Sequence, residues 1–200
     1  MKSTHIVLEG IDGAGTTTQR ARIAQALSKR GYDVHETAEP SGLPVGKLIR
    51  QALQKEPEWE PTQFALAFAL DRLDHVKREI EPAMRAGKVV LSDRYVISSL
   101  VYQSLELPMD WVESLNRHAP EPDLTLLVDL DVEEAEMRRS KRGGPEEIFD
   151  ANETQQRLRA AYLDCARRYP NTYIVSGSGS VEEVTKRLLD IIDTQLGSSQ

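Results

Sequence analysis

The chain of 200 residues has one cysteine, no long apolar run and no excess of positive charge. Because Cys165 stands alone, no disulfide can form within the chain, and we expect a cytoplasmic protein. The absence of a run of about 18 apolar residues excludes a transmembrane helix, and the first residues lack the layout of a signal peptide. The net charge of −7 argues against a nucleic-acid-binding surface. We therefore expect neither nucleic acid nor a membrane as a partner.

Short apolar runs alternate with amphipathic stretches along the whole chain, which predicts a mostly parallel sheet with helices on both faces. Strands are expected at 5–9, 33–37, 88–92, 124–129 and 172–175. Helices are expected at 16–30, 45–55, 61–86, 94–105, 109–118, 132–141, 151–168 and 181–195. Pro82 is expected to kink or break the end of the third helix. No repeat, linker or second domain is visible, so residues 1–200 are expected to form one domain.

A glycine-rich segment lies between the first strand and the first helix, in the context that a phosphate-binding loop requires. Its glycines let backbone N–H groups surround phosphate oxygens, and the helix N-terminus favours an anion. The candidate ATP-binding residues are Gly10, Asp12, Gly13, Ala14, Gly15, Thr16, Thr17 and Thr18. Thr17 supplies the hydroxyl that the pattern G-x-x-x-x-G-K-[ST] places on magnesium, but Thr16 stands where lysine is usual. The alternative is an ordinary turn. With the strand and helix pattern, the loop predicts a three-layer phosphate-loop NTPase-type α/β sandwich with a five-stranded parallel sheet.

Asp93 and Arg94 follow a buried strand, at the sheet edge where such folds bind ligands. The carboxylate can hold magnesium through water, and the guanidinium can bridge phosphoryl groups; a strand-end salt bridge is the alternative. Ser98, Ser99 and Tyr102 follow at helical spacing and could line a polar pocket, although Tyr102 could equally be a half-buried aromatic residue.

Two further segments carry residues suited to a nucleotide. Phe68 and Arg72 share a helix face and would form a platform for a flat base, whereas His75 on the same face is expected to be structural. The turn that starts at Glu39 precedes Arg50, and the pattern leaves open whether Arg50 faces the cleft or solvent.

Basic residues, among them Arg138 and Arg142, end a helix before Gly143 and Gly144. One interpretation is a solvated helix end, where cations favour the helix dipole. The other is a lid over about 138–152 that closes arginines onto a transferred phosphate.

Taken together, these motifs resemble the thymidylate kinase family of nucleoside monophosphate kinases over nearly the whole chain. The most specific part is the run from Asp93 through Ser98 and Tyr102 to Gln103, found together with the Phe68/Arg72 helix. The resemblance implies that ATP and dTMP are the substrates, that Mg²⁺ is bound by Thr17 and Asp93, and that the protein is a homodimer.

The resemblance also implies roles at the matching positions. Phe68 would stack on thymine, Arg72 would bond its carbonyl edge, and Ser99 would face the ring nitrogen. Tyr102 would crowd the sugar 2′ position, and Asp12 would hold the 3′-hydroxyl region. Arg50 and Arg94 would grip the dTMP phosphate. The substrate-binding set implied in this way is Asp12, Glu39, Arg50, Phe68, Arg72, Arg94, Ser98, Ser99, Tyr102 and Gln103.

The chain departs from the family pattern at three places that usually carry basic residues near phosphate: Thr16, Ala38 and the segment 147–150. Loss of one charged donor typically slows a reaction roughly 100- to 1000-fold, so another cation must compensate if the site is catalytic. Our hypothesis is that Arg138 or Arg142 supplies this charge, with Arg20, one helical turn beyond Thr16, in second place. The catalytic set is then Arg94, Asp93, Arg142 and Arg138.

The sequence therefore predicts an ATP-dependent dTMP kinase that makes dTDP for dTTP synthesis. Two alternatives stay open: a non-catalytic or weakly active nucleotide-binding relative, and an enzyme with another acceptor such as dUMP. Asp93, Arg94, Phe68 and Arg72 favour the enzyme, because a protein that only binds nucleotide has little need of a phosphate-bridging arginine.

Overall fold

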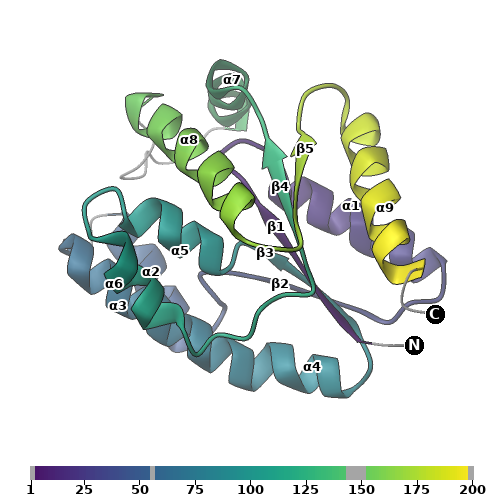
Figure 1. Ribbon diagram of the computed structural model, residues 1–200, viewed down its shortest axis with the longest axis horizontal. Coiled ribbons are helices and arrows are strands. Elements are labelled where there is room, and N and C mark those ends of the chain that lie inside the picture. The colour runs from purple at the N-terminus through teal and green to yellow at the C-terminus, as the bar shows by residue number, and fades with distance from the viewer. Residues whose placement is uncertain (1–2, 55–56, 143–151, 198–200) are drawn as a thin grey trace.

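A computed structural model of the chain describes residues 3–54, 57–142 and 152–197. Its centre is a five-stranded sheet in the order β2-β3-β1-β4-β5, in which every neighbouring pair is parallel (Figure 1). The strands are β1 (Thr4–Glu9), β2 (Val34–Ala38), β3 (Val89–Asp93), β4 (Leu124–Asp129) and β5 (Thr172–Ser176). The helices are α1 (Thr16–Lys29), α2 (Pro44–Leu53), α3 (Pro61–His75), η1 (Val76–Ile80), α4 (Glu81–Arg85), α5 (Val96–Gln103), α6 (Met109–Asn116), α7 (Val132–Arg142), α8 (Asn152–Arg168) and α9 (Val181–Gly197).

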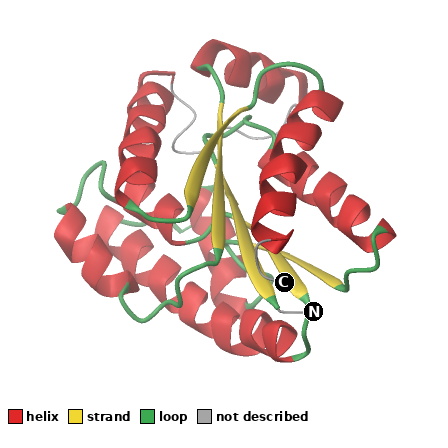
Figure 2. Ribbon diagram, turned by 45° about the vertical axis from the view of Figure 1, so that its right-hand side comes forward, coloured by secondary structure: helices red, strands yellow, loops and turns green. Residues whose placement is uncertain are grey.

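Helices cover both faces of the sheet, so the predicted three-layer sandwich is confirmed. Helices α1 and α9 lie together on one face, and α4, α5 and α8 lie on the other (Figures 1 and 2). Within the described ranges, no helix is long and apolar enough to cross a membrane.

Alternating side chains of β1 enter two apolar clusters, as the period of a strand requires. Ile6 and Leu8 belong to the larger cluster, which reaches α1, α5, α8 and α9. Val7 belongs to a second cluster with Val90 and the η1 residues Val76 and Ile80. The central strand is therefore buried on both sides, and its carboxyl end is a rigid support for the loop that follows.

The long helix predicted at 61–86 forms, but Pro82 does not break it. A π-helical segment, η1, joins α3 to α4, and Pro82 lies in the first turn of α4. Proline lacks an N–H group and its ring clashes with the carbonyl four residues earlier. The wider π turn before Pro82 accommodates this locally, so of the expected kink or break, the break does not occur.

Strand register brings three segments of the expected site to one edge of the sheet. Asp93 is paired with Leu8 of β1 and with Ala38 of β2. The N–H of Glu39 donates to the carbonyl of Asp93 at 3.0 Å, and the N–H of Arg94 donates to the carbonyl of Leu8 at 2.8 Å. The phosphate loop, the Glu39 turn and the Asp93-Arg94 pair therefore start from neighbouring points.

Buried His5 is expected to make stability depend on pH. Burial lowers the pKa of His5 from 6.5 to about 4, although the Glu39 and Asp123 carboxylates oppose this. Between these two pH values the His5 side chain is protonated in the unfolded chain but neutral in the folded chain. The free energy of unfolding therefore falls by about 3 kcal/mol as pH drops from 6.5 to about 4. We expect His5→Asn to lose less stability than the parent between about pH 7 and pH 4.5 in urea unfolding. Equal losses in the two proteins would contradict this.

Candidate active site

The glycine-rich segment forms a loop that wraps the N-terminus of α1. Gly13 and Gly15 have φ angles of +92° and +94°, a region that favours glycine, and Gly15 is the N-cap of α1. Thr16 is buried, with its methyl carbon 3.5 Å from where a Cβ on Gly10 would lie. Thr17 and Thr18 are exposed. The loop therefore offers backbone N–H groups and the helix dipole to an anion.

A cavity of about 870 Å³ extends from this loop across the carboxyl edge of the sheet to α3 and α5. Its lining includes all the candidate residues of the loop except Gly10. It also includes Glu39, Arg50, Phe68, Arg72, Asp93, Arg94, Ser98, Ser99, Tyr102, Gln103 and Arg138. Within the described part of the chain, its basic lining residues are all arginines. The fold thus brings residues from five separate segments into one cavity. These residues were predicted from the sequence, but their proximity depends on the tertiary structure.

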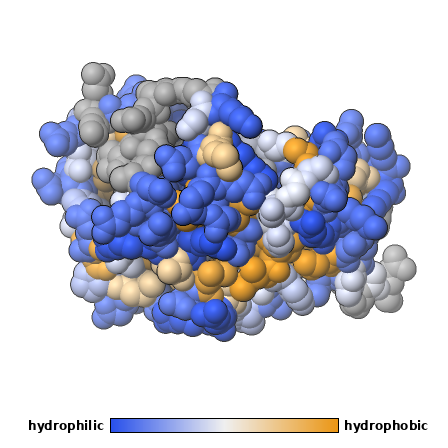
Figure 3. All heavy atoms as spheres, turned by 90° about the horizontal axis from the view of Figure 1, so that it is seen from above, coloured by the Kyte–Doolittle hydropathy of each residue, from blue (hydrophilic) through white to orange (hydrophobic). Residues whose placement is uncertain are grey.

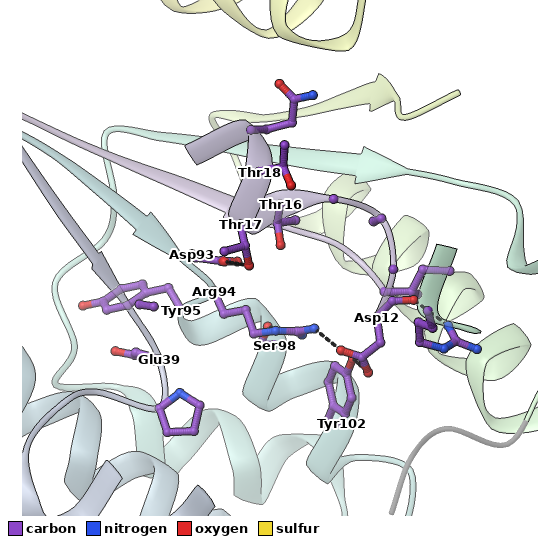
Figure 4. Close-up of a pocket in the computed structure, with 18 of the residues that line it drawn as sticks. Asp12, Thr16, Thr17, Thr18, Glu39, Asp93, Arg94, Tyr95, Ser98 and Tyr102 are labelled. Carbon is purple, nitrogen blue, oxygen red and sulfur yellow. Dashed lines mark hydrogen bonds and ion pairs between the residues drawn. The ribbon is translucent and has the colours of Figure 1, made fainter. Parts of the chain in front are cut away.

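Arg94 lies at the centre of this cavity, where its Nη2 atom is 2.6 Å from Oδ1 of Asp12 in the loop (Figure 4). Its other terminal nitrogen donates to Ser98 Oγ at 3.2 Å and to the Tyr162 hydroxyl at 3.1 Å. Arg94 has a φ of +72°, which an arginine adopts only when surrounding contacts hold it. Helix α5 consequently starts at Val96 rather than at the predicted residue 94. The guanidinium is fixed between the phosphate loop and α5.

The charge of Arg94 is balanced by two carboxyl groups. Burial raises the pKa of Asp12, but Arg94 and hydrogen bonds from Tyr102 and Gln155 more than offset this, and the pKa lies below its usual value. Burial raises the pKa of Glu9, which accepts hydrogen bonds from Ser98 Oγ at 2.6 Å and from the N–H of Tyr95 at 2.9 Å. The Arg94 guanidinium is therefore held by the Asp12 carboxylate of the loop and by the buried hydrogen bonds that link Ser98 to Glu9.

Asp93 and Thr17 supply oxygen atoms suited to a hard cation. The Thr17 hydroxyl donates to Asp93 Oδ2 at 2.5 Å, as the dashed line in Figure 4 shows. The second carboxylate oxygen, Oδ1, is buried and accepts no hydrogen bond from the described residues. A hydroxyl, one carboxylate and bound water are typical ligands of Mg²⁺ beside phosphates. The donor set at this position therefore fits magnesium.

The far end of the cavity is built around Arg72, whose side chain is 1% exposed. Its Nη2 lies 2.7 Å from Glu39 Oε2, and its Nη1 donates to Ser99 Oγ at 3.0 Å and also to Asn116 Oδ1. Glu39 is held in turn by His75, whose Nδ1 is 3.1 Å from Oε1. His75 is fully buried between Glu39 and Thr37, in keeping with the structural role expected for it.

The remaining substrate-side residues also face this space. Arg50 lines the cavity, where it donates to the carbonyl oxygens of Pro40 and Ser41, so it faces the cleft rather than solvent alone. The Tyr102 hydroxyl donates to Asp12 Oδ2 at 2.8 Å. Gln103 is buried and its Oε1 accepts no hydrogen bond from the described residues. Ser98 lines the cavity, but its hydroxyl is engaged by Glu9 and Tyr162.

The predicted lid is described only at its ends. Residues 138–142 continue α7 and residue 152 begins α8, whereas 143–151 and the side chain of Arg142 lie outside the described residues. Arg138 lies beside Gly15, with Nη1 3.8 Å from where a Cβ there would lie. Arg20, the second candidate for the missing lysine, is instead paired with Glu36 at 3.2 Å and donates to the carbonyl of Thr37. Its side chain leans toward β2 rather than over the loop.

Sequence reasoning missed several residues that hold the site together. Arg139 donates to the carbonyl of Asp12 at 2.5 Å, and Gln155 Nε2 lies 3.2 Å from Asp12 Oδ2. Tyr162 contacts Ser98, Glu9 and Arg94. A signal existed in α8, because Gln155 and Tyr162 are seven residues apart and fall on the face that also carries buried Leu158 and Cys165. Polar groups on a buried helix face need partners, and here the partners are site residues.

The Tyr162 hydroxyl is expected to act as a positioning group for Arg94. Tyr162→Phe removes one neutral acceptor from the guanidinium, and for the nucleotide kinase activity that the resemblance implies we expect kcat/KM for the acceptor nucleotide to fall about tenfold. KM for ATP should change little, because Tyr162 does not line the cavity. Tyr173→Phe, which removes an exposed hydroxyl bonded to Gln195, is the matched control. Equal steady-state constants for the two variants would exclude the positioning role.

A parallel sheet, a glycine loop at its carboxyl edge and a cavity lined by arginines define a phosphate-loop nucleotide-binding protein. Similarity to known proteins identifies the family. The "Thymidylate kinase" family model matches residues 8–188. A "Probable thymidylate kinase" of Thermococcus kodakarensis is 41% identical over 96% of this chain and 98% of its own length. A "Probable thymidylate kinase" of Pyrococcus abyssi is 39% identical over 98% of each chain. The "Thymidylate kinase" of Ruegeria pomeroyi is 38% identical over 98% of this chain and 97% of its own. The chain belongs to the thymidylate kinase family.

Proposed function

We propose that this protein transfers the γ-phosphoryl group of ATP to dTMP and releases ADP and dTDP. The observation that carries the proposal is the position of Arg94, which lies between the phosphate loop and the α3–α5 pocket within one cavity. ATP phosphates in the loop and a nucleoside monophosphate under Phe68 and Arg72 would meet at this guanidinium. Hydrophilic residues cover most of the face that Figure 3 shows, although apolar residues gather along one side of it.

The residues of the cavity divide the work of the transfer between them. An oxygen of the dTMP phosphate forms a bond to the γ-phosphorus as the bond from that phosphorus to the β,γ-bridging oxygen breaks. Arg94 and Arg50 hold the acceptor phosphate, and the loop N–H groups hold the donor phosphates. Thr17 and Asp93 would hold Mg²⁺, which supplies neutralising charge between donor phosphates. Because little covalent chemistry is asked of the protein, positioning and charge account for catalysis.

The base pocket supports a pyrimidine acceptor. Phe68 offers an apolar platform, while Arg72, Ser99 and the free Oε1 of buried Gln103 provide donors and an acceptor at its end. The Tyr102 ring, over which the Arg94 guanidinium lies at 5.1 Å, would stand beside the sugar and favour a deoxyribose.

A coupled assay of ADP release with dTMP, run at high enzyme concentration, tests this function directly. We expect turnover that depends on dTMP and magnesium, with dUMP as the comparison acceptor. Calorimetry with ATP and with dTMP should accompany it. Binding of both nucleotides without ADP release would favour the alternative, a non-catalytic nucleotide-binding relative.

We further propose that the protein is a cytoplasmic homodimer. Leu66 and Leu70 on α3 are 50% and 57% exposed, and Leu73 continues the same stripe. Leu48 on the neighbouring helix α2 is also exposed. A contiguous apolar stripe is unusual on the surface of a monomer and suits a self-complementary interface. The single cysteine, Cys165, is buried, as suits a reducing compartment.

Leu70→Glu is expected to convert the dimer into monomers, because it buries a carboxylate in the proposed interface. Light scattering after gel filtration would show the mass halved. Ile174→Glu on the edge strand β5, which changes a comparably exposed apolar residue elsewhere, should leave the mass unchanged. A parent protein that is already monomeric would refute the homodimer.

A further inference from the structure

The phosphate loop lacks the lysine that usually neutralises the donor phosphates, and among the described residues the guanidinium of Arg138 lies beside Gly15, next to the position where that lysine is usual. We propose that Arg138 of α7, oriented by Glu134, binds the donor phosphates and supplies the charge that Thr16 cannot. This inference rests on the proposed use of ATP. It does not depend on the identity of the acceptor.

Helix α7 is docked directly on the phosphate loop. A Cβ on Gly13 would lie 3.0 Å from the carbonyl carbon of Ala135 and 3.1 Å from Cγ of Arg139. The guanidinium of Arg139 donates to the carbonyl of Asp12 at 2.5 Å. This close approach requires glycine at position 13 and fixes the height of α7 above the loop. A side chain that leaves α7 one turn after Glu134 therefore has a fixed starting point.

Arg138 leaves α7 toward the loop and lines the cavity. Its Nη2 atom is 2.6 Å from Glu134 Oε1 and 3.1 Å from the carbonyl of Gly177. Its Nη1 atom lies 3.8 Å from where a Cβ on Gly15 would be. One terminal nitrogen of the planar guanidinium, Nη2, is therefore held by Glu134 and Gly177, and the other, Nη1, faces Gly15, the N-cap of α1. A phosphate held by N–H groups of the loop at Gly15 would lie within reach of Nη1.

Glu134 is itself held in place by a neighbouring segment. Its Oε2 accepts a hydrogen bond from Ser178 Oγ at 3.1 Å, in the connection between β5 and α9. The carboxylate thus joins α7 to that connection and orients the guanidinium. Arg138 and Glu134 are about one-third exposed, so the pair is screened by water and the arginine stays available to a highly charged ligand.

The other described cations that line the cavity have different positions. Arg94 is paired with Asp12, Arg50 donates to the Pro40 and Ser41 carbonyls, and Arg72 is buried at the base end. Arg139 reaches the loop from the side of Asp12. Arg138 is the described cation whose guanidinium lies next to Gly15, directly before the position where lysine is usual.

A double-mutant cycle on Thr16 and Arg138 tests this inference. We expect Arg138→Ala to weaken ATP binding roughly 10- to 100-fold, the effect of losing a charge-assisted hydrogen bond. Thr16→Lys alone should change the affinity by less than about threefold, since Arg138 already occupies the place of the charge. In the Arg138→Ala background, Thr16→Lys should restore most of the lost affinity. The readout is calorimetry with the magnesium complex of ATP, repeated with AMP, whose affinity should not respond.

Arg187→Ala provides the matched control. Arg187 donates to the carbonyls of Ser176 and Ser178 in the same β5–α9 connection, but it does not line the cavity. We expect it to leave ATP affinity within about twofold of the parent, with no response to Thr16→Lys.

Two results would overturn the inference: Arg138→Ala that binds ATP like the parent, or a loss that Thr16→Lys does not repair. Because the readout is binding, it is separate from the proposed function. A parent that binds ATP through Arg138 yet releases no ADP with dTMP would refute the dTMP kinase activity alone. A parent that does not bind ATP would refute both.

Discussion

Arg94→Ala is expected to lower kcat for dTMP phosphorylation by about a thousandfold or more, the range seen when a phosphate-bridging arginine is removed. The guanidinium contacts Asp12, Ser98 and Tyr162 and lies between the phosphate loop and α5, where we propose that the donor and acceptor phosphates meet. Its removal also leaves the carboxylate of Asp12 without its counter-ion. The measurement is steady-state turnover at saturating ATP, with dTMP varied so that kcat and KM are separated.

Arg94→Lys separates charge from shape. Lysine keeps the positive charge but cannot bridge two phosphoryl groups as a planar fork, so we expect most of the loss to persist. Arg85→Ala, which removes an exposed arginine paired with Glu81, is the matched control. Thermal unfolding must show that each variant is folded, because the φ of +72° at Arg94 makes this position sensitive to its contacts. If a folded Arg94→Ala variant retains a tenth of the parent kcat, the proposal that Arg94 is a catalytic residue is wrong.

Much of this architecture could be predicted because it depends on local patterns. The alternation of apolar runs with amphipathic stretches gave the order of strands and helices, and the span of β4 agrees at both ends. Gly31 and Gly87, which follow helices, have φ angles of +89° and +79°, as is typical of a glycine just beyond a helix end. The phosphate loop was found for the same reason: its spacing is encoded within nine consecutive residues.

Interactions between distant segments were not visible in the same way. Arg72 was expected to point at a base, but whether its other nitrogens were satisfied depended on Glu39 and Asn116 from two other elements. Tyr162 lies 68 residues from Arg94 and shows no motif of its own. The docking of α7 on Gly13 is likewise a tertiary contact. From sequence alone, basic residues at a helix end such as Arg138 are expected to face solvent, and only the tertiary structure shows which segment lies opposite them.

Thr16 illustrates how the two kinds of information combine. The loop pattern alone identified the missing lysine, because the residue type at one position departs from a fixed spacing. It could not say whether the charge was lost or moved. That answer depends on where α7, more than 110 residues later in the chain, places its side chains. The sequence therefore posed the question, and the packing of α7 against the loop supports the proposal for Arg138, whereas the side chain of Arg142 lies outside the described residues.

Gly13→Ala is expected to reduce both the stability of the protein and its affinity for ATP. Two separate effects add: the φ of +92° costs an L-residue about 1 to 2 kcal/mol, and the new methyl group collides with the backbone of Ala135. The collision is difficult to relieve, because the new methyl group belongs to the phosphate loop and the Ala135 carbonyl belongs to the backbone of α7. We expect the free energy of unfolding to fall by about 2 to 5 kcal/mol. ATP affinity should fall as well, because displacement of α7 carries Arg138 away from Gly15.

Gly31→Ala is the matched control, because it isolates the backbone effect. Gly31 has nearly the same φ, +89°, but no atom lies within 4 Å of where its Cβ would be. It should therefore lose only the conformational term and retain the ATP affinity of the parent. The difference between the two variants in urea unfolding measures the contact between α7 and the loop. If Gly13→Ala and Gly31→Ala lose equal stability and bind ATP equally well, α7 does not rest on the loop, and Arg138 has no fixed place beside the phosphates.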